Sequence, residues 1–212
     1  SGDYGISKNP ESFASQSFRS YFTDKQRGVV LRLSKDGLVP ISDHGMKDWF
    51  ADNLKAASGN LPIVGSYDVK KDTYNLTLSN IHYTFDSLIP QNNVTVSFNE
   101  KTNGWTSFKS FIQYGGVSLN NNYFTFSNGE MYRHHALLNE TNTATFYNVR
   151  TNPYIDVLLN QAPGSIKSFG TLNYEGSQSR ITPDLTDGQY YNNFAKEGWF
   201  LRSGETDLQA MS

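Results

Sequence analysis

The chain has 212 residues, a formal net charge of −2 and no cysteine. The near-neutral charge gives no sign of the basic clusters that bind nucleic acid or anionic lipid, and the lack of cysteine excludes disulfides and cysteine-ligated zinc. A hydrophobic share of 37% is enough for a packed core, and 14% aromatic residues beside abundant Asn, Ser and Thr favour strands and turns. We therefore expect one β-rich domain over residues 1–212.

Neither end of the sequence carries a recognisable targeting signal. No run reaches the roughly 18 apolar residues that are needed to cross a bilayer, so we expect no membrane insertion. The first residues lack a basic segment followed by an apolar one, which a secretory signal would show. The abrupt ends predict that the chain is a piece of a longer protein.

The first half of the chain reads as strands separated by polar turns. Residues 1–20 are predicted to form an extended lead-in with a turn at Asn9-Pro10. Beyond it, apolar side chains alternate with polar ones, which is typical of half-buried strands. The strands predicted as far as residue 100 are 19–24, 29–34, 38–41, 63–69, 73–79, 81–86 and 93–100.

Residues 43–58 interrupt these strands with the period of a helix. The apolar side chains that recur at helical spacing are Met46, Trp49, Phe50, Leu54 and Ala57. Ser42 or Asp43 is predicted to cap the start of this helix, and Gly59 stands where a left-handed stop is expected. We expect the apolar stripe to pack on a sheet rather than to bind a partner.

The second half of the chain returns to strands. Residues 121–135 predict a hairpin, because Asn128-Gly129 is the strongest short-range turn signal in the sequence. The elements predicted after it are a strand at 143–149, one or two helical turns at 153–159, β structure at 166–176, a long loop at 177–193 and a last strand at 198–201.

Three hairpins, at residues 20–33, 65–78 and 122–135, share one pattern. Each begins with an aromatic strand, turns over polar residues and returns with alternating apolar side chains. The intervals between them are close to the blade length of propellers, but they are unequal. The predicted fold class is therefore mainly β, with antiparallel hairpins in a propeller-like or sandwich arrangement and one amphipathic helix. An open meander and an α+β arrangement are the alternatives.

The residues that could carry chemistry form no enzyme signature. His134 and His135 are adjacent in a predicted strand, so their side chains would point to opposite faces and could not bind one metal ion together. His44 and His82 are expected to be structural or solvent-facing. The sequence has no nucleophile elbow, no dinucleotide-binding glycine motif and no phosphate loop. We expect a protein without enzymatic activity, cofactor or metal.

A sugar-binding surface is the main alternative to a purely structural role. Two acids in a polar loop could hold a sugar or form the carboxylate pair of a glycoside hydrolase, although a solvated turn is the simpler interpretation. Aromatic rings could stack on sugars, but tryptophan is more often a core or interface residue. The candidate interaction surface consists of Trp105, Tyr114, Asp184, Asp187, Tyr190 and Trp199.

The run NPESFASQSFRSYFTDKQRGVVLRLSKDGLVPISDHGMKDWFADNL, residues 9–54, resembles a segment of large virion structural proteins of tailed bacteriophages, especially contractile-tailed phages of marine bacteria. The resemblance continues through residues 96–111, 128–135 and 166–179, and so covers most of the chain. It implies a tail, baseplate or fibre component in the virion that assembles with other virion proteins or with copies of itself. It supplies no catalytic motif. The alternative is a module that binds a host glycan at the tail tip, and a glycan-degrading enzyme is a third hypothesis.

Overall fold

The computed structural model describes residues 4–6, 9–56, 62–79, 93–135, 144–157, 164–168 and 170. The chain divides into two units, Ser1–Ile155 and Asp156–Ser212. Few residues of the second unit are described, and every helix and strand reported below belongs to the first. The prediction of a single domain over residues 1–212 therefore stays a prediction.

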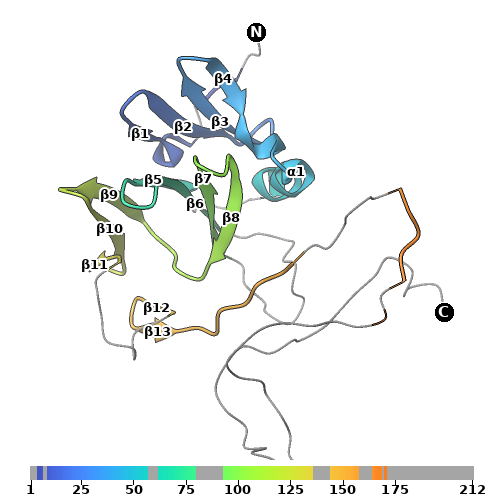
Figure 1. Cartoon of the computed structure of the whole chain (residues 1–212). Helices are drawn as coiled ribbons and strands as arrows, with labels where there is room; N and C mark the ends of the chain where they lie inside the picture. Colours follow the sequence, from blue (N-terminus) through green and yellow to red (C-terminus); the bar gives the residue numbers. More distant parts are fainter. Residues whose placement is uncertain are drawn as a thin grey trace, which may run out of the picture. The chain divides into compact units, whose positions relative to one another are not determined.

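The described strands form four antiparallel sheets (Figure 1). Sheet A contains, side by side in chain order, β1 (Ala14–Gln16), β2 (Arg19–Asp24), β3 (Val29–Ser34) and β4 (Gly37–Pro40). Sheet B contains β5 (Val64–Asp68), β6 (Thr73–Ser79), β7 (Asn93–Asn99) and β8 (Gly104–Lys109). Sheet C has the order β11 (Glu130–Arg133), β10 (Asn122–Ser127), β9 (Gly115–Leu119). Sheet D pairs β12 (Thr145–Phe146) with β13 (Val149–Arg150).

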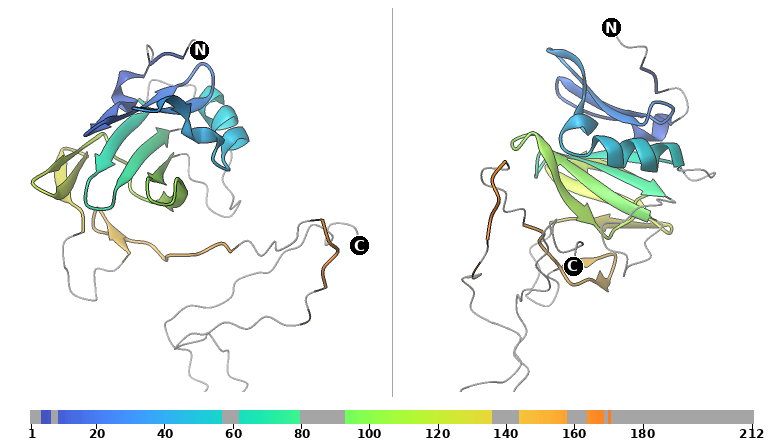
Figure 2. Two further views of the ribbon diagram at one scale, coloured as in Figure 1. Left: turned by 45° about the horizontal axis from the view of Figure 1, so that its top comes forward. Right: turned by 90° about the vertical axis from the view of Figure 1, so that its right-hand side faces the viewer.

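Sheets A and B pack face to face, with the helix α1 (Lys47–Ala56) beside them (Figure 2). In the middle of this core the ring of Tyr21 on β2 stacks on Tyr67 and Tyr74 of sheet B, with ring centroids 5.4 and 4.8 Å apart. Burial of such rings is a large stabilising contribution. The mainly β fold class is confirmed, and the layers are consistent with the sandwich arrangement.

The predicted helix packs as expected, but it begins later than expected. Phe50 and Leu54 are fully buried in the core, and the ring of Phe50 lies 4.5 Å from the ring of Trp105 on β8. Ser42 and Asp43 do not cap α1, because they belong to a separate 3-10 helix, η2 (Ile41–Asp43). Gly59 lies outside the described residues.

The turn between β2 and β3 shows why a glycine is required beside the helix. Gly28 has a φ of +70°, and a Cβ atom there would lie 2.8 Å from the Cα of Ala51 in α1. Any larger residue would therefore push the turn away from the helix. In the same turn Arg27 folds back and donates to the carboxylate of Asp24 at 3.1 Å.

One buried carboxylate joins the two sheets at their edge. Glu100, in the turn after β7, accepts a hydrogen bond from the hydroxyl of Tyr21 at 2.5 Å and one from Arg32 at 2.9 Å. The guanidinium of Arg19 lies 3.5 Å away. Because these three partners come from sheet A, this carboxylate fixes the position of sheet B against it.

The boundaries of many elements were predicted well, but several predictions were wrong. The Asn128-Gly129 turn is confirmed, with positive φ at both residues. The lead-in is not wholly extended, because it contains η1 (Pro10–Ser12) and β1. The strand at 143–149 is instead the short hairpin of β12 and β13, and residues 153–157 form no helix. The predicted elements at 81–86, 177–193 and 198–201 lie outside the described residues.

Candidate interaction surface on sheet C

Sheet C turns its apolar side chains outward. Side chains alternate along each strand, so every second residue of β9, β10 and β11 points away from sheet B. We call these residues the outer face of sheet C: Gly115, Val117, Leu119, Asn122, Phe124, Phe126, Met131 and Arg133. Leu119 and Met131 are 68% and 63% exposed. A contiguous apolar sheet face of this kind usually marks an interaction site.

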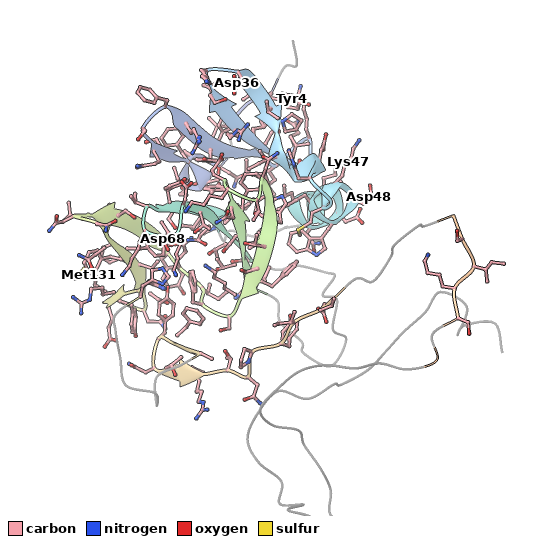
Figure 3. All side chains as sticks on the ribbon, in the orientation of Figure 1. Tyr4, Asp36, Lys47, Asp48, Asp68 and Met131 are labelled. Carbon is pink, nitrogen blue, oxygen red and sulfur yellow. The ribbon has the colours of Figure 1, made fainter. Side chains whose placement is uncertain are left out.

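The other face of sheet C is polar, and its central residues Tyr123, Thr125 and Ser127 are buried. It presents Gly116, Ser118, Tyr123, Thr125 and Ser127 toward sheet B. The facing surface of sheet B is also polar and consists of the buried residues Ser66, Asp68, Asn75, Thr77, Thr95 and Ser97. The two sheets therefore meet through a polar layer, and Figure 3 labels Asp68 within it and Met131 on sheet C.

Hydrogen bonds satisfy the centre of this polar layer. The hydroxyl of Tyr123 lies 2.6 Å from the Oγ of Ser66, and Asn75 donates to it at 3.1 Å. Ser66 also donates to the Oε1 of Gln113 at 2.7 Å. Burial raises the pKa of the Tyr123 hydroxyl above its ordinary value, so it stays protonated as a donor.

A glycine lets sheet C come this close. A Cβ atom on Gly116 would lie 2.7 Å from the Cβ of Ser66 and 2.8 Å from the Oε1 of Gln113. These distances are shorter than any stable contact between such atoms. The absence of a side chain at this position is therefore a condition for the hydrogen bonds of the layer.

A short contact between a histidine and a carboxylate holds the end of the β10–β11 hairpin to β5. The Nε2 of His135 lies 2.5 Å from the Oδ2 of Asp68, which is fully buried. The backbone N–H groups of Lys70 and Lys71 donate to the other oxygen at 3.0 and 3.2 Å. Burial by itself would raise the pKa of Asp68, but His135 and the backbone donors outweigh it and hold that pKa below its ordinary value.

His134 is a second buried member of the layer. Its ring packs 4.9 Å from Phe111 and 4.8 Å from Tyr123, and its Nε2 lies 2.7 Å from the Oγ1 of Thr125. Burial, together with the electrostatic effect of His135 and Lys109, lowers the pKa of His134 to about 4. The ring is therefore neutral at pH 7, and acid must charge it inside the protein.

Lys109 brings an amine to the same layer. Its Nζ donates to the Oδ1 of Asn75 at 3.4 Å and lies 5.8 Å from the centre of the Phe111 ring. Burial lowers the pKa of this amine, although the carboxylate of Asp68 acts in the opposite direction. The charged amine of Lys109 therefore loses more by leaving water than it gains from its neighbours in the layer.

The structure separates the residues of the predicted interaction surface. Trp105 is not an exposed platform, because its ring packs against Phe50 and Phe98 and its Nε1 donates to the carbonyl of Ile41 at 3.0 Å. Tyr114 is 60% exposed and lies just before β9 at the edge of sheet C. The other four candidates, Asp184, Asp187, Tyr190 and Trp199, lie outside the described residues.

The sequence did not predict that His134 and His135 would join the polar layer. They do not lie in a strand, because β11 ends at Arg133 and the next two residues form a turn in which His135 has a φ of +55°. Their rings are 6.1 Å apart, and each reaches a different partner. The positive φ, which few residues other than glycine adopt, has no clear signature in the sequence.

Comparison of the sequence with protein-family models and with curated proteins finds no match. Within the described residues, no helix is both long and apolar enough to cross a membrane. The same part of the chain contains no cluster of three or more His, Cys, Asp or Glu side chains arranged to hold a metal ion.

Proposed function

We propose that this chain is a non-enzymatic structural domain of a bacteriophage virion, at the tail or baseplate, and that it acts by assembling with other virion proteins or with copies of itself through the outer face of sheet C. The place in the virion is suggested by the resemblance of residues 9–54 and the later runs to virion structural proteins. The mode of action is suggested by the structure.

The observation that carries the proposal is the reversed polarity of sheet C. A three-stranded sheet ordinarily buries its apolar face and exposes its polar one. Here the buried face holds Tyr123 and Thr125, whereas Leu119 and Met131 are left in water. Residues that depart from the usual burial of apolar side chains commonly have a function. A protein partner on the outer face would remove Leu119 and Met131 from water.

Methionine oxidation offers a direct test of the proposal. Met131 stands on the outer face, and Met46 is partly buried against the core, so the two serve as probe and internal control. In the dilute isolated chain, hydrogen peroxide should oxidise Met131 faster than Met46. In purified phage particles that contain the chain, we expect Met131 to be protected at least about fivefold while Met46 is unchanged. Mass spectrometry of the tryptic peptides measures both.

Two results would contradict the proposal. If Met131 is oxidised equally fast in the particle and in the isolated chain, the outer face is not a virion contact. If the chain is found only outside purified particles, the virion role is wrong.

Host-glycan binding is the weaker proposal, because only one of the two described aromatic candidates is exposed. Tyr114 offers an accessible ring, whereas Trp105 is a core contact. If the chain binds host glycans through this ring, Tyr114→Ala should abolish binding on a glycan array, and Tyr114→Phe should retain it because stacking needs only the ring. Equal binding by both variants would exclude Tyr114 from such a site.

A further inference from the structure

We infer that the partner of the outer face of sheet C is a second copy of this chain, packed face to face about a two-fold axis that runs along β10. This inference rests on the proposed function and names the partner of the same surface. It commits to one arrangement of the two sheets, in which β11 of each copy lies over β9 of the other.

One row of side chains across sheet C is complementary to itself under this axis. Phe126 in the central strand pairs with Met131 on one side and with Gly115 on the other. The row therefore consists of a long flexible side chain, an aromatic ring and a hole. A two-fold axis along β10 exchanges β11 with β9, so the methionine of each copy enters the glycine hole of the other. The two phenylalanine rings meet on the axis, where aromatic pairs gain stability beyond their buried area.

The next row fits the same axis. Phe124 pairs with Arg133 on β11 and with Val117 on β9. The axis places each arginine over the valine of the other copy, where its aliphatic stem can cover apolar surface while the charge reaches water. With strands about 4.8 Å apart and sheets about 10 Å apart, the two arginine strands are about 14 Å apart. This exceeds the Debye length of about 8 Å at physiological salt, so the two charges repel little.

The size of the face decides how strong the contact should be. The exposed apolar side chains of the face are Val117, Leu119, Phe126 and Met131. Together they offer roughly 400 Å² per copy, about half of the roughly 800 Å² that a standard interface buries on each partner. We therefore expect a reversible dimer that forms at high protein concentration, as it would at the high local concentration of an assembled particle.

A residue exchange tests the arrangement in the full chain. Gly115→Met fills the hole, and its new side chain points outward, since a Cβ atom there meets only Phe126 at 3.9 Å. Met131→Ala removes the long side chain. We expect each single change to weaken the dimer at least about tenfold, and the double variant to return within about threefold of the original chain, because the axis merely exchanges hole and side chain. Sedimentation velocity measures the shift from the 23.9 kDa monomer to twice that mass.

Circular dichroism and urea unfolding of each variant show whether its fold is intact, and the double variant guards against a trivial loss of folding. The inference is overturned if the chain stays monomeric at millimolar concentration. It is also overturned if the two changes add their effects, or if neither change affects dimerisation. A monomer whose Met131 is nevertheless protected in phage particles would refute the second copy as partner and leave the proposed function standing.

Discussion

Replacing Gly116 by alanine should separate sheet C from sheet B. The new Cβ atom would lie 2.7 Å from the Cβ of Ser66, where carbon atoms in contact prefer about 3.5 to 4.0 Å. The overlap of about 1 Å cannot be relieved by a flexible side-chain end alone, because the Cβ of Ser66 is fixed to β5. Either β9 moves outward or the hydrogen bonds of Ser66 are distorted.

The expected loss follows from these contacts. Overpacking a closed interior typically costs 1 to 3 kcal/mol, and each distorted hydrogen bond adds about 1 kcal/mol. Since Ser66 bonds both Gln113 and Tyr123, we expect Gly116→Ala to lower the free energy of unfolding by about 3 kcal/mol. The general benefit of alanine over glycine, about 0.4 to 1 kcal/mol through the unfolded chain, offsets only part of this loss.

The neighbouring glycine is a matched control. A Cβ atom on Gly115 would meet only Phe126 at 3.9 Å, which is an ordinary contact. Urea unfolding followed by tryptophan fluorescence, at a protein concentration low enough to keep the chain monomeric, should show Gly115→Ala within about 0.5 kcal/mol of the original chain. If Gly115→Ala and Gly116→Ala are equally stable, the close packing of β9 on β5 does not contribute to stability and the reasoning fails.

Three further predictions concern buried titratable side chains. The pKa of His134 is lower in the folded protein than its unfolded value of 6.5, so the unfolded chain takes up a proton first as the pH falls. The free energy of unfolding should therefore drop by about 2 kcal/mol between pH 7 and pH 5. His134→Phe should flatten this slope in urea titrations at each pH, and an unchanged slope would exclude this histidine as its source. Lys109→Met should raise the free energy of unfolding by about 1 kcal/mol. The control Lys101→Met, at an exposed position, should leave the free energy of unfolding nearly unchanged. A loss of stability in the first variant would show that the amine is well compensated. Glu100→Gln removes the charge that interacts with Arg19 and Arg32 and weakens the hydrogen bond from Tyr21, so it should lower the free energy of unfolding by about 3 kcal/mol. The control Glu11→Gln, at an exposed position, should leave this free energy nearly unchanged. Equal melting temperatures of these two variants would argue against a joining role for this carboxylate.

Local sequence signals were sufficient for much of the secondary structure. Asn128 and Gly129 adopt the positive φ values that their types allow, so the hairpin they form could be expected from two residues. The bounds of β2, β3 and β6 follow from alternation and from the turns between them. The start of α1 was misplaced because Ser42 and Asp43, good caps in general, are already engaged in η2.

The candidate site could be predicted only in part. Tyr114 was expected on a surface and is exposed, but nothing near Trp105 in the sequence shows that Phe50 and Phe98 will enclose it. The outer face of sheet C was not predicted as a site. No strand was predicted at residues 115–119, and the apolar residues of the hairpin at 121–135 would ordinarily be assigned to the buried side.

By itself, the sequence determined the alternation of side chains along strands such as β2 and β3 and the turn at Asn128-Gly129, because both depend on the geometry of a few neighbouring residues. Only the tertiary structure decided which face of sheet C is buried. That choice depends on contacts between residues far apart in the chain, such as the bond between Asp68 and His135 and the close approach of Gly116 to Ser66. These contacts satisfy polar groups that would be costly to bury alone, and so they leave the apolar side chains on the surface.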